Sequence, residues 1–388
     1  MLFTLIGVGL GFLVALIPGF SSNNLSMLLI TYGLISSNYL LAVTNVALEI
    51  SNSFFEFLLP IIAGIGNEAT ALVVDSVYAR MSEESFRHEM GIIIGGGLVG
   101  IIVSLPLLFF AEKIYPIVYS SLNPILGWIL LILCIYMIWI ERGWKKFFAL
   151  VIFCLSGLLG LIVKNSGFVA TDYYLVPIFI GLYGFSSIIS KKYEKIEVIH
   201  EIGIIEKLRL ISIAFLSSLF ASLISGMKRG QASALALQLG NITQREEVLF
   251  ILPAISLAFA TLSIFVLFSI GKVRSTLAYD VQQIMGEIYF PQTILFVGVI
   301  ALSACISAFV LILLAKPLGK LLSKINSKYL KILGFCIGCL LIINFTGIRG
   351  MLLAFTATCI GILSSRFHVR STHLMGVLLL PSIVSMIL

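Results

Sequence analysis

The chain has 388 residues, of which 60% are hydrophobic and only 11% are charged, and its mean hydropathy is +1.12. Soluble globular proteins carry about 25% charged residues, so this composition excludes a soluble globule. The net charge of +7 does not indicate a nucleic-acid partner, because the basic residues cluster in short connections, as in cytoplasmic loops that face anionic lipid. The apolar segments are also too long for barrel strands of about 9 to 11 residues. We therefore predict an all-α polytopic protein of the cell membrane, crossing it many times.

The first apolar run, from Leu2 to Ile35, contains an interruption that we expect to break its helix. Proline removes a backbone donor, and glycine permits backbone angles that other residues avoid. Broken backbone at membrane depth needs polar partners, and in secondary transporters it forms part of the substrate site. A short external loop between two ordinary spans is the alternative. The candidate binding residues of this stretch are Pro18, Gly19, Ser21, Ser22, Asn23 and Asn24.

Further spans follow in order along the chain. We predict them at Ala42–Ile65, Met90–Ala111, Pro124–Ile140, Phe147–Val163, Tyr174–Ser190, Leu249–Ile270, Ile294–Ala315, Ile332–Phe345, Leu352–Leu363 and His373–Leu388. The longest polar segment, Lys191 to Arg209, is interpreted as a solvated linker, with an amphipathic surface helix as the alternative. The predicted organisation is a first transmembrane half at 1–190, a cytoplasmic linker at 191–207 and a second half at 208–388.

An internal repeat supports this division. Five identities at a constant offset of 207 relate Leu16, Ile17, Gly19, Leu28 and Gly33 to Leu223, Ile224, Gly226, Leu235 and Gly240. A second block has an offset of 205 and relates Ser51, Phe54, Gly66 and Asp75 to Ser256, Phe259, Gly271 and Asp280. Both blocks keep their order and spacing, which favours two copies of one helical unit.

The basic loops predict that the second copy is inverted. Four basic groups belong inside by the positive-inside rule, and they lie at 142–146, 191–195, 316–331 and 366–370. All four lie inside together if Leu2–Ile35 and Leu208–Gly240 are hairpins that leave the membrane on the side from which they enter. Five crossings then separate the copies, and an odd number inverts the second copy, as in many transporters.

Charged residues within the repeats are functional candidates, because each costs about 2.5 to 3.5 kcal/mol in hydrocarbon. Ammonium and guanidinium groups bind carboxylate or phosphate, so the cations favour anion handling; contact with lipid headgroups is the alternative. The candidate binding residues here are Gly66, Asn67, Gly226, Lys228, Arg229, Gly271, Lys272, Arg274 and Ser275. The candidates for carrying a coupling ion or proton, or for pairing with those cations, are Glu49, Glu56, Asp75 and Asp280.

Four short motifs resemble the large membrane subunit of tripartite tricarboxylate transporters, most nearly its stand-alone archaeal members. They are Leu16-Ile17-Pro18-Gly19 with Asn23, the run from Phe54 to Pro60 and Gly64, the run Ile270 to Ser275, and the closing run Met375 to Pro381. Bacterial members take up citrate-like or other carboxylates with an external binding protein and a small membrane subunit, driven by an ion gradient. The resemblance implies a permease whose site includes 18–24 and 270–275.

We therefore expect a permease that moves an anionic solute, most simply a carboxylate, by alternating access. A translocase for a polyprenyl phosphate, or another lipid-linked anion, is the first alternative, and a non-transporting membrane scaffold or receptor is the second. No enzyme is expected, since the histidines lack zinc-site spacing and Cys336 and Cys339 have no second ligand pair. We expect no cofactor and no metal centre, with Na⁺ or H⁺ as the candidate coupling ion. Membrane lipids surround the chain. The residues do not indicate a binding-protein or small-subunit partner, but they leave both open, as they leave a homo-oligomer open.

Overall fold

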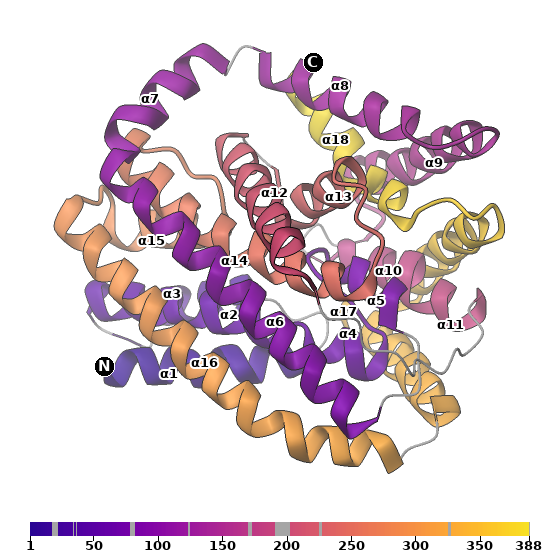
Figure 1. Cartoon of the computed structure of the whole chain (residues 1–388), viewed down its shortest axis with the longest axis horizontal. Helices are drawn as coiled ribbons and strands as arrows, with labels where there is room; N and C mark the ends of the chain where they lie inside the picture. The colour runs from indigo at the N-terminus through magenta and orange to yellow at the C-terminus, as the bar shows by residue number, and fades with distance from the viewer. Residues whose placement is uncertain are drawn as a thin grey trace.

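The computed structural model describes residues 1–17, 22–33, 35, 37–77, 82–122, 125–169, 173–190, 202–224, 227–324 and 327–387. Every regular element in these ranges is a helix, as Figure 1 shows. The first part of the chain contains α1 (Leu2–Leu16), α2 (Ser22–Thr31), α3 (Asn38–Phe55), α4 (Leu58–Ala63), α5 (Ala71–Val77), α6 (Glu83–Ser104), η1 (Leu105–Phe110), α7 (Ala111–Leu122), α8 (Leu126–Trp139), α9 (Lys145–Ser166), α10 (Leu175–Phe179), η3 (Ile180–Phe185) and α11 (Ser186–Ser190).

The second part repeats the alternation of short and long helices. It contains α12 (Ile204–Leu223), α13 (Arg229–Leu239), α14 (Arg245–Ile270), α15 (Thr276–Met285), α16 (Phe290–Lys324), α17 (Ser327–Arg366), η4 (Ser371–Met375) and α18 (Gly376–Ile387). Helix α17 consists of two segments that meet at Gly347, whose positive φ of 63° bends the chain between the two spans predicted there. Helix α12 begins at Ile204, four residues before the predicted start of the second half.

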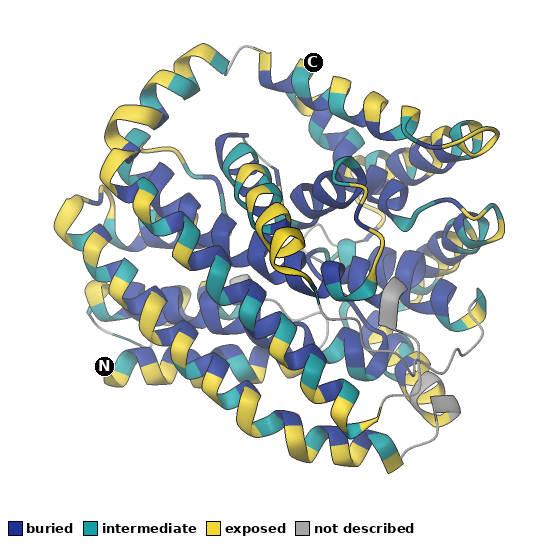
Figure 2. Ribbon diagram, viewed as in Figure 1, coloured by how far each residue is buried: buried dark blue, intermediate teal, exposed yellow. Residues whose placement is uncertain are grey.

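Length and hydropathy make this an integral multi-pass membrane protein. Among the described residues, six helical segments are long and apolar enough to cross a bilayer: Asn38–Ala63, Glu83–Leu122, Lys145–Ser166, Arg245–Ile270, Phe290–Lys324 and Ile332–Arg366. Large apolar side chains on the outer faces of α7, α8 and α16 are exposed, among them Ile117, Trp139 and Phe309 (Figure 2). Such surfaces suit lipid as their solvent.

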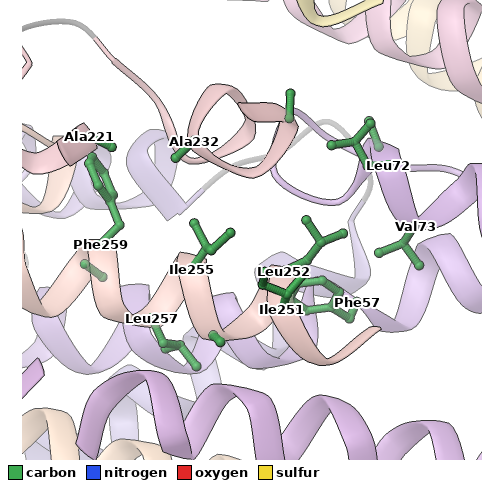
Figure 3. Close-up of a cluster of buried hydrophobic side chains, with 14 of the residues drawn as sticks. Phe57, Leu72, Val73, Ala221, Ala232, Ile251, Leu252, Ile255, Leu257 and Phe259 are labelled. Atoms are coloured by element: carbon green, nitrogen blue, oxygen red, sulfur yellow. The ribbon is translucent and has the colours of Figure 1, made fainter. Parts of the chain in front are cut away.

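Helix α14 forms the centre of the protein. Its most apolar stretch is buried all round, which is the pattern of a helix enclosed by others. Figure 3 shows its side chains Ile255 and Leu252 extending toward Ala232 of α13 and Leu72 of α5. Helix α6 packs directly on its backbone, because a Cβ atom at Gly96 or Gly100 would lie only 2.1 or 2.3 Å from a carbonyl oxygen of α14.

Both predicted helix breaks are present. Helix α1 ends at Leu16, Ile17 is extended and α2 begins at Ser22. Helix α12 ends at Leu223, Ile224 is extended and α13 begins at Arg229. In each half a broken helix pair precedes a long buried helix, α3 or α14, which agrees with the repeat; the inverted halves and their boundaries remain a prediction.

Candidate functional site

The start of α13 lies against the connection between α4 and α5. Gln231 accepts a hydrogen bond from the backbone N–H of Lys228 (2.7 Å), which organises the first turn, and donates one to Ser382 of α18 (2.8 Å). A Cβ atom at Gly230 would lie 2.0 Å from the carbonyl oxygen of Glu68, so only glycine permits this approach. The same backbone contact brings Lys228 to Glu68, with 2.8 Å between Nζ and Oε2.

Arg229, the first residue of α13, is held between two carboxylates of α3 and its C-cap. Its Nη1 donates to Ser53 Oγ at 2.7 Å and lies 3.3 Å from Glu56 Oε1, and its Nη2 lies 3.4 Å from Glu49 Oε1. Residues 49, 53 and 56 share one face of α3 because helical neighbours recur every three or four positions. We call Glu49, Ser53, Glu56 and Arg229 the central ion-pair cluster.

Further polar side chains hold the two carboxylates of this cluster. Ser22 at the start of α2 donates to Glu49 Oε2, and Asn67 Nδ2 donates to Glu56 Oε2 at 2.8 Å. Asn67 Oδ1 also accepts from the backbone N–H groups of Ala69 and Thr70, at 2.9 and 3.0 Å, which fixes the α4–α5 connection. Residues from both broken helix pairs therefore converge on α3.

Helix α2 also reaches the second half of the chain. Ser26 donates a hydrogen bond to Asp280 of α15, and both side chains are buried. Asn45, one helical turn before Glu49 on α3, is 1% exposed, and neither atom of its amide has a hydrogen-bond partner. This region thus combines several buried carboxylates with an amide that retains its full hydrogen-bonding capacity.

Arg274 lies apart from the central ion-pair cluster, just before α15. It is 7% exposed, and its Nε and Nη2 have no hydrogen-bond partner. Its guanidinium carbon stands 4.9 Å from the centre of the Tyr119 ring of α7, a cation–π contact. Ser275 is the N-cap of α15, since its Oγ accepts from the N–H of Ala278 at 3.0 Å, and it contacts Ser263 Oγ at 2.7 Å.

The predicted site residues therefore fall into several groups. The structure brings Ser22, Glu49, Glu56, Asn67 and Arg229 together, whereas Arg274 and Ser275 lie at a different place and Lys272 and Gly271 are exposed. Lys228 pairs with Glu68, Asp280 bonds to Ser26, Gly66 is buried in the α4–α5 connection, and Asn24 lies in α2. Pro18, Gly19, Ser21 and Gly226 lie outside the described residues, as do the side chains of Asn23 and Asp75.

A separate polar network closes one end of the helices and was not predicted. Glu141, in the α8–α9 turn, accepts from Gln238 at 3.2 Å, and its Oε1 lies 3.1 Å from Nε2 of the fully buried His373. Thr372 donates to Gln238 Oε1 at 2.7 Å, and Arg370 Nε lies 3.9 Å from Glu141. The hydrogen bond with His373 is the main cause that lowers the pKa of Glu141 below its ordinary 4.5. The isolated positions of Glu141 and Gln238 in the sequence gave no signal for this network.

The residues that sequence reasoning overlooked are mostly partners of the predicted residues. Ser26, Gln231 and Tyr119 fall in this class. A periodicity signal existed for Ser53, which lies four positions after Glu49 and three before Glu56 on one helical face. No such signal exists for Tyr119, because its partner is more than a hundred residues away in the chain.

Comparison with known proteins places the chain in a family. The family model described as "Tripartite tricarboxylate transporter TctA family" matches residues 1–376. The chain belongs to this family. It is also similar to an uncharacterized protein of the archaeon Methanocaldococcus jannaschii, with 25% identity over 403 aligned residues that cover 99% of this chain and 98% of that protein. No solved structure matches the chain.

Family membership confirms the resemblance read from the four motifs. The family indicates that the chain is a component of a tricarboxylate transporter, and its members are transporters rather than enzymes. The archaeal relative agrees with the likeness to stand-alone archaeal members. Together with the apolar helices, the family supports an integral protein of the cell membrane.

Proposed function

We propose that this chain is a permease that moves an anionic solute, a carboxylate, across the cell membrane by alternating access. The observation that carries the anion assignment is Arg274. It is a buried guanidinium with two unpartnered N–H groups, and no carboxylate among the described residues pairs with it. Uncompensated charge within a membrane protein is costly, by about 2.5 to 3.5 kcal/mol on insertion scales, and marks a functional position.

The surroundings of Arg274 favour an anion over any other ligand. The 10-residue helix α15 begins two residues later, and the partial positive charge of a helix N-terminus adds to that of the guanidinium. Arginine binds carboxylates through two parallel hydrogen bonds, for which free Nε and Nη2 atoms on one edge are suited. The hydroxyl of Ser275 adds a polar group at the same helix start.

The central ion-pair cluster supports a coupling ion. Glu49 and Glu56 both face the single guanidinium of Arg229, so the cluster has one more acidic group than it has basic groups. Asp280 adds another buried carboxylate, bonded to Ser26. A proton or Na⁺ bound here would neutralise the surplus, and either ion serves as coupling ion in transporters built from broken helices.

Alternating access is supported by the position of the two helix breaks. The starts of α2 and α13 both contact α3, through the bond from Ser22 to Glu49 and the pairing of Arg229 with Glu49 and Glu56. Discontinuous helices that meet at one place are typical of transporters that work by alternating access, in which the unwound backbone also holds the coupling ion. An external binding protein and a small membrane subunit, typical of the family, are proposed partners for this chain.

Reconstitution tests the proposal. The purified chain in proteoliposomes should accumulate radiolabelled citrate or a dicarboxylate under an imposed Na⁺ or pH gradient. Arg274→Ala should reduce uptake at least tenfold, which corresponds to about 1.4 kcal/mol of lost solute binding. Arg274→Lys should retain part of it, because the charge stays while the paired donors are lost.

Lys316→Ala provides the control, since it removes a positive charge from an exposed side chain of α16 outside the candidate site, and it should transport like the native chain. Equal uptake by Arg274→Ala and native protein would contradict the anion assignment. Transfer of a polyprenyl phosphate across the vesicle membrane without carboxylate uptake would instead assign the chain to lipid-linked anions.

A further inference from the structure

An apolar groove lies between α8, α12 and α13, and neither Arg229 nor Arg274 is among its lining residues. Its cavity volume of about 430 Å³ falls within the range of about 300 to 1,000 Å³ that ligand pockets occupy. Its walls are mainly hydrocarbon, from Leu133, Ile213, Leu216, Phe220, Leu235 and Leu239. The carboxylates of a citrate-like solute could not form hydrogen bonds with these hydrocarbon side chains.

One end of the groove is basic. Arg209, exposed near the start of α12, lines the groove and donates a hydrogen bond to the carbonyl oxygen of Gly240. Arg370 does not line the groove, but its Nη2 donates to the side chain of Asn241, the residue after Gly240, and its Nη1 is buried without a hydrogen-bond partner among the described residues. The two guanidinium groups therefore bond to two adjacent residues at this end of the groove. The opposite end, at Phe220 and Met227, is apolar.

The basic end belongs to the cytoplasmic surface. Arg370 lies 3.9 Å from Glu141, which precedes the basic residues of the α8–α9 turn at 142–146. Loops with several lysines and arginines remain on the cytoplasmic side. From Arg209 to Phe220 the groove follows eleven residues of α12, or roughly 16 Å at 1.5 Å per residue, about half of a 30 Å hydrocarbon core. The groove thus spans one leaflet, the inner one.

We infer that this groove binds an acidic phospholipid of the inner leaflet, with one acyl chain between α12 and α13 and its phosphate at Arg209, at the end of the groove that Arg370 makes more positive. The apolar walls suit a hydrocarbon chain, and the depth suits one leaflet. The basic end at the membrane surface suits a headgroup of net negative charge, because the choline cation of a zwitterionic headgroup would offset the attraction of its phosphate. This site is independent of the proposed transport of a solute. Because α13 forms one wall and begins with Arg229, a bound lipid would also stabilise the helix of the central ion-pair cluster.

Lipid retention by the purified full-length chain tests this inference. Delipidated protein is titrated with phosphatidylglycerol or with phosphatidylcholine of the same acyl chains, and bound lipid is counted by native mass spectrometry. The native chain should bind phosphatidylglycerol more tightly. Arg209→Ala should weaken phosphatidylglycerol about fivefold, as expected for one basic residue near a membrane surface, and should leave phosphatidylcholine unchanged.

Lys207→Ala is the control, because it removes an equal charge from the same exposed end of α12 without lining the groove, and it should bind like the native chain. A second variant, Ser217→Phe, fills the groove from a half-exposed position and should lower binding of both lipids while leaving the lipid-free protein folded. Equal affinity for the two lipids, an Arg209→Ala variant that matches Lys207→Ala, or undiminished binding by Ser217→Phe would each overturn the inference. So would displacement of phosphatidylglycerol from the native chain by a polyprenyl phosphate at equal concentration, since the groove would then suit a lipid-linked substrate.

Discussion

Arg229 and Arg274 both stand at the start of a helix in the second half of the chain, yet their surroundings are opposite. Arg229 faces Glu49 and Glu56 and donates to Ser53, so its charge is compensated within the protein. Arg274 is buried against Tyr119 with Nε and Nη2 unpartnered. The comparison shows that an arginine at the start of a helix pairs with carboxylates in one place and has no carboxylate partner among the described residues in the other, where we propose that it binds an anion.

The largest effect is expected when the compensated arginine is removed. Arg229→Ala leaves two buried carboxylates without a counter-ion, and breaking a buried pair typically costs 3–5 kcal/mol, so we expect a loss of about 4 kcal/mol in the free energy of unfolding. Denaturant unfolding in detergent measures it. The double variant Arg229→Ala/Glu56→Gln should recover part of the loss because one charge is removed. A single variant as stable as the native chain would show that the cluster contributes nothing to the fold.

A backbone contact holds Arg229 in place and predicts the next largest effect. Gly230→Ala places a Cβ atom against the Glu68 carbonyl oxygen, so α13 must shift, at a cost of about 1–3 kcal/mol in unfolding free energy. Gly298→Ala is the matched control, since nothing lies within 4 Å of its added Cβ atom in α16. If both variants unfold at the same temperature, the contact between α13 and the α4–α5 connection is looser than described.

The polar network at Glu141 lies outside the membrane spans. It predicts a smaller change in the free energy of unfolding, and this change depends on pH. The lowered pKa of Glu141 means that its ionised form stabilises the folded chain above pH 4.5 and that this contribution is lost as pH falls through the folded-state pKa. Glu141→Gln should therefore unfold about 1 kcal/mol more easily at pH 7, and the difference should narrow below pH 4.5. Thermal unfolding from pH 7 to pH 3 measures it; a difference that widens on acidification would contradict the assignment.

Much of the fold could be predicted because local chemistry determines it. The length of each apolar run predicted the spans, and proline or glycine next to small polar residues marked both helix breaks. The described helices on either side end at Leu16 and Leu223 and begin again at Ser22 and Arg229. The sequence was less informative where a helix continues beyond its apolar part. Helix α16 extends to Lys324 instead of ending near Ala315, because lysines are tolerated where a helix leaves the membrane.

The candidate site was predictable in its residue types and unpredictable in its pairings. Glu56 and Arg229 are 173 positions apart, and composition alone could not tell whether that arginine awaits a solute or pairs with a carboxylate. The same uncertainty applied to Arg274, whose cation–π contact comes from Tyr119 of α7. Compensation of charge is a property of three-dimensional packing, so only the structure separates the two arginines.

The most direct test of the difference between the two arginines is solute binding by Arg274→Ala, read as a shift in thermal stability with a panel of di- and tricarboxylates, inorganic phosphate and short polyprenyl phosphates. A bound ligand raises apparent stability by about 2.7 kcal/mol at a hundredfold excess over Kd. We expect a carboxylate to stabilise the native chain and the Lys316→Ala variant. It should lose its effect in Arg274→Ala, which should fold without ligand because the substitution removes a buried charge that no described carboxylate compensates. An undiminished carboxylate shift in Arg274→Ala would contradict the account, because the solute would then bind without the unpaired guanidinium.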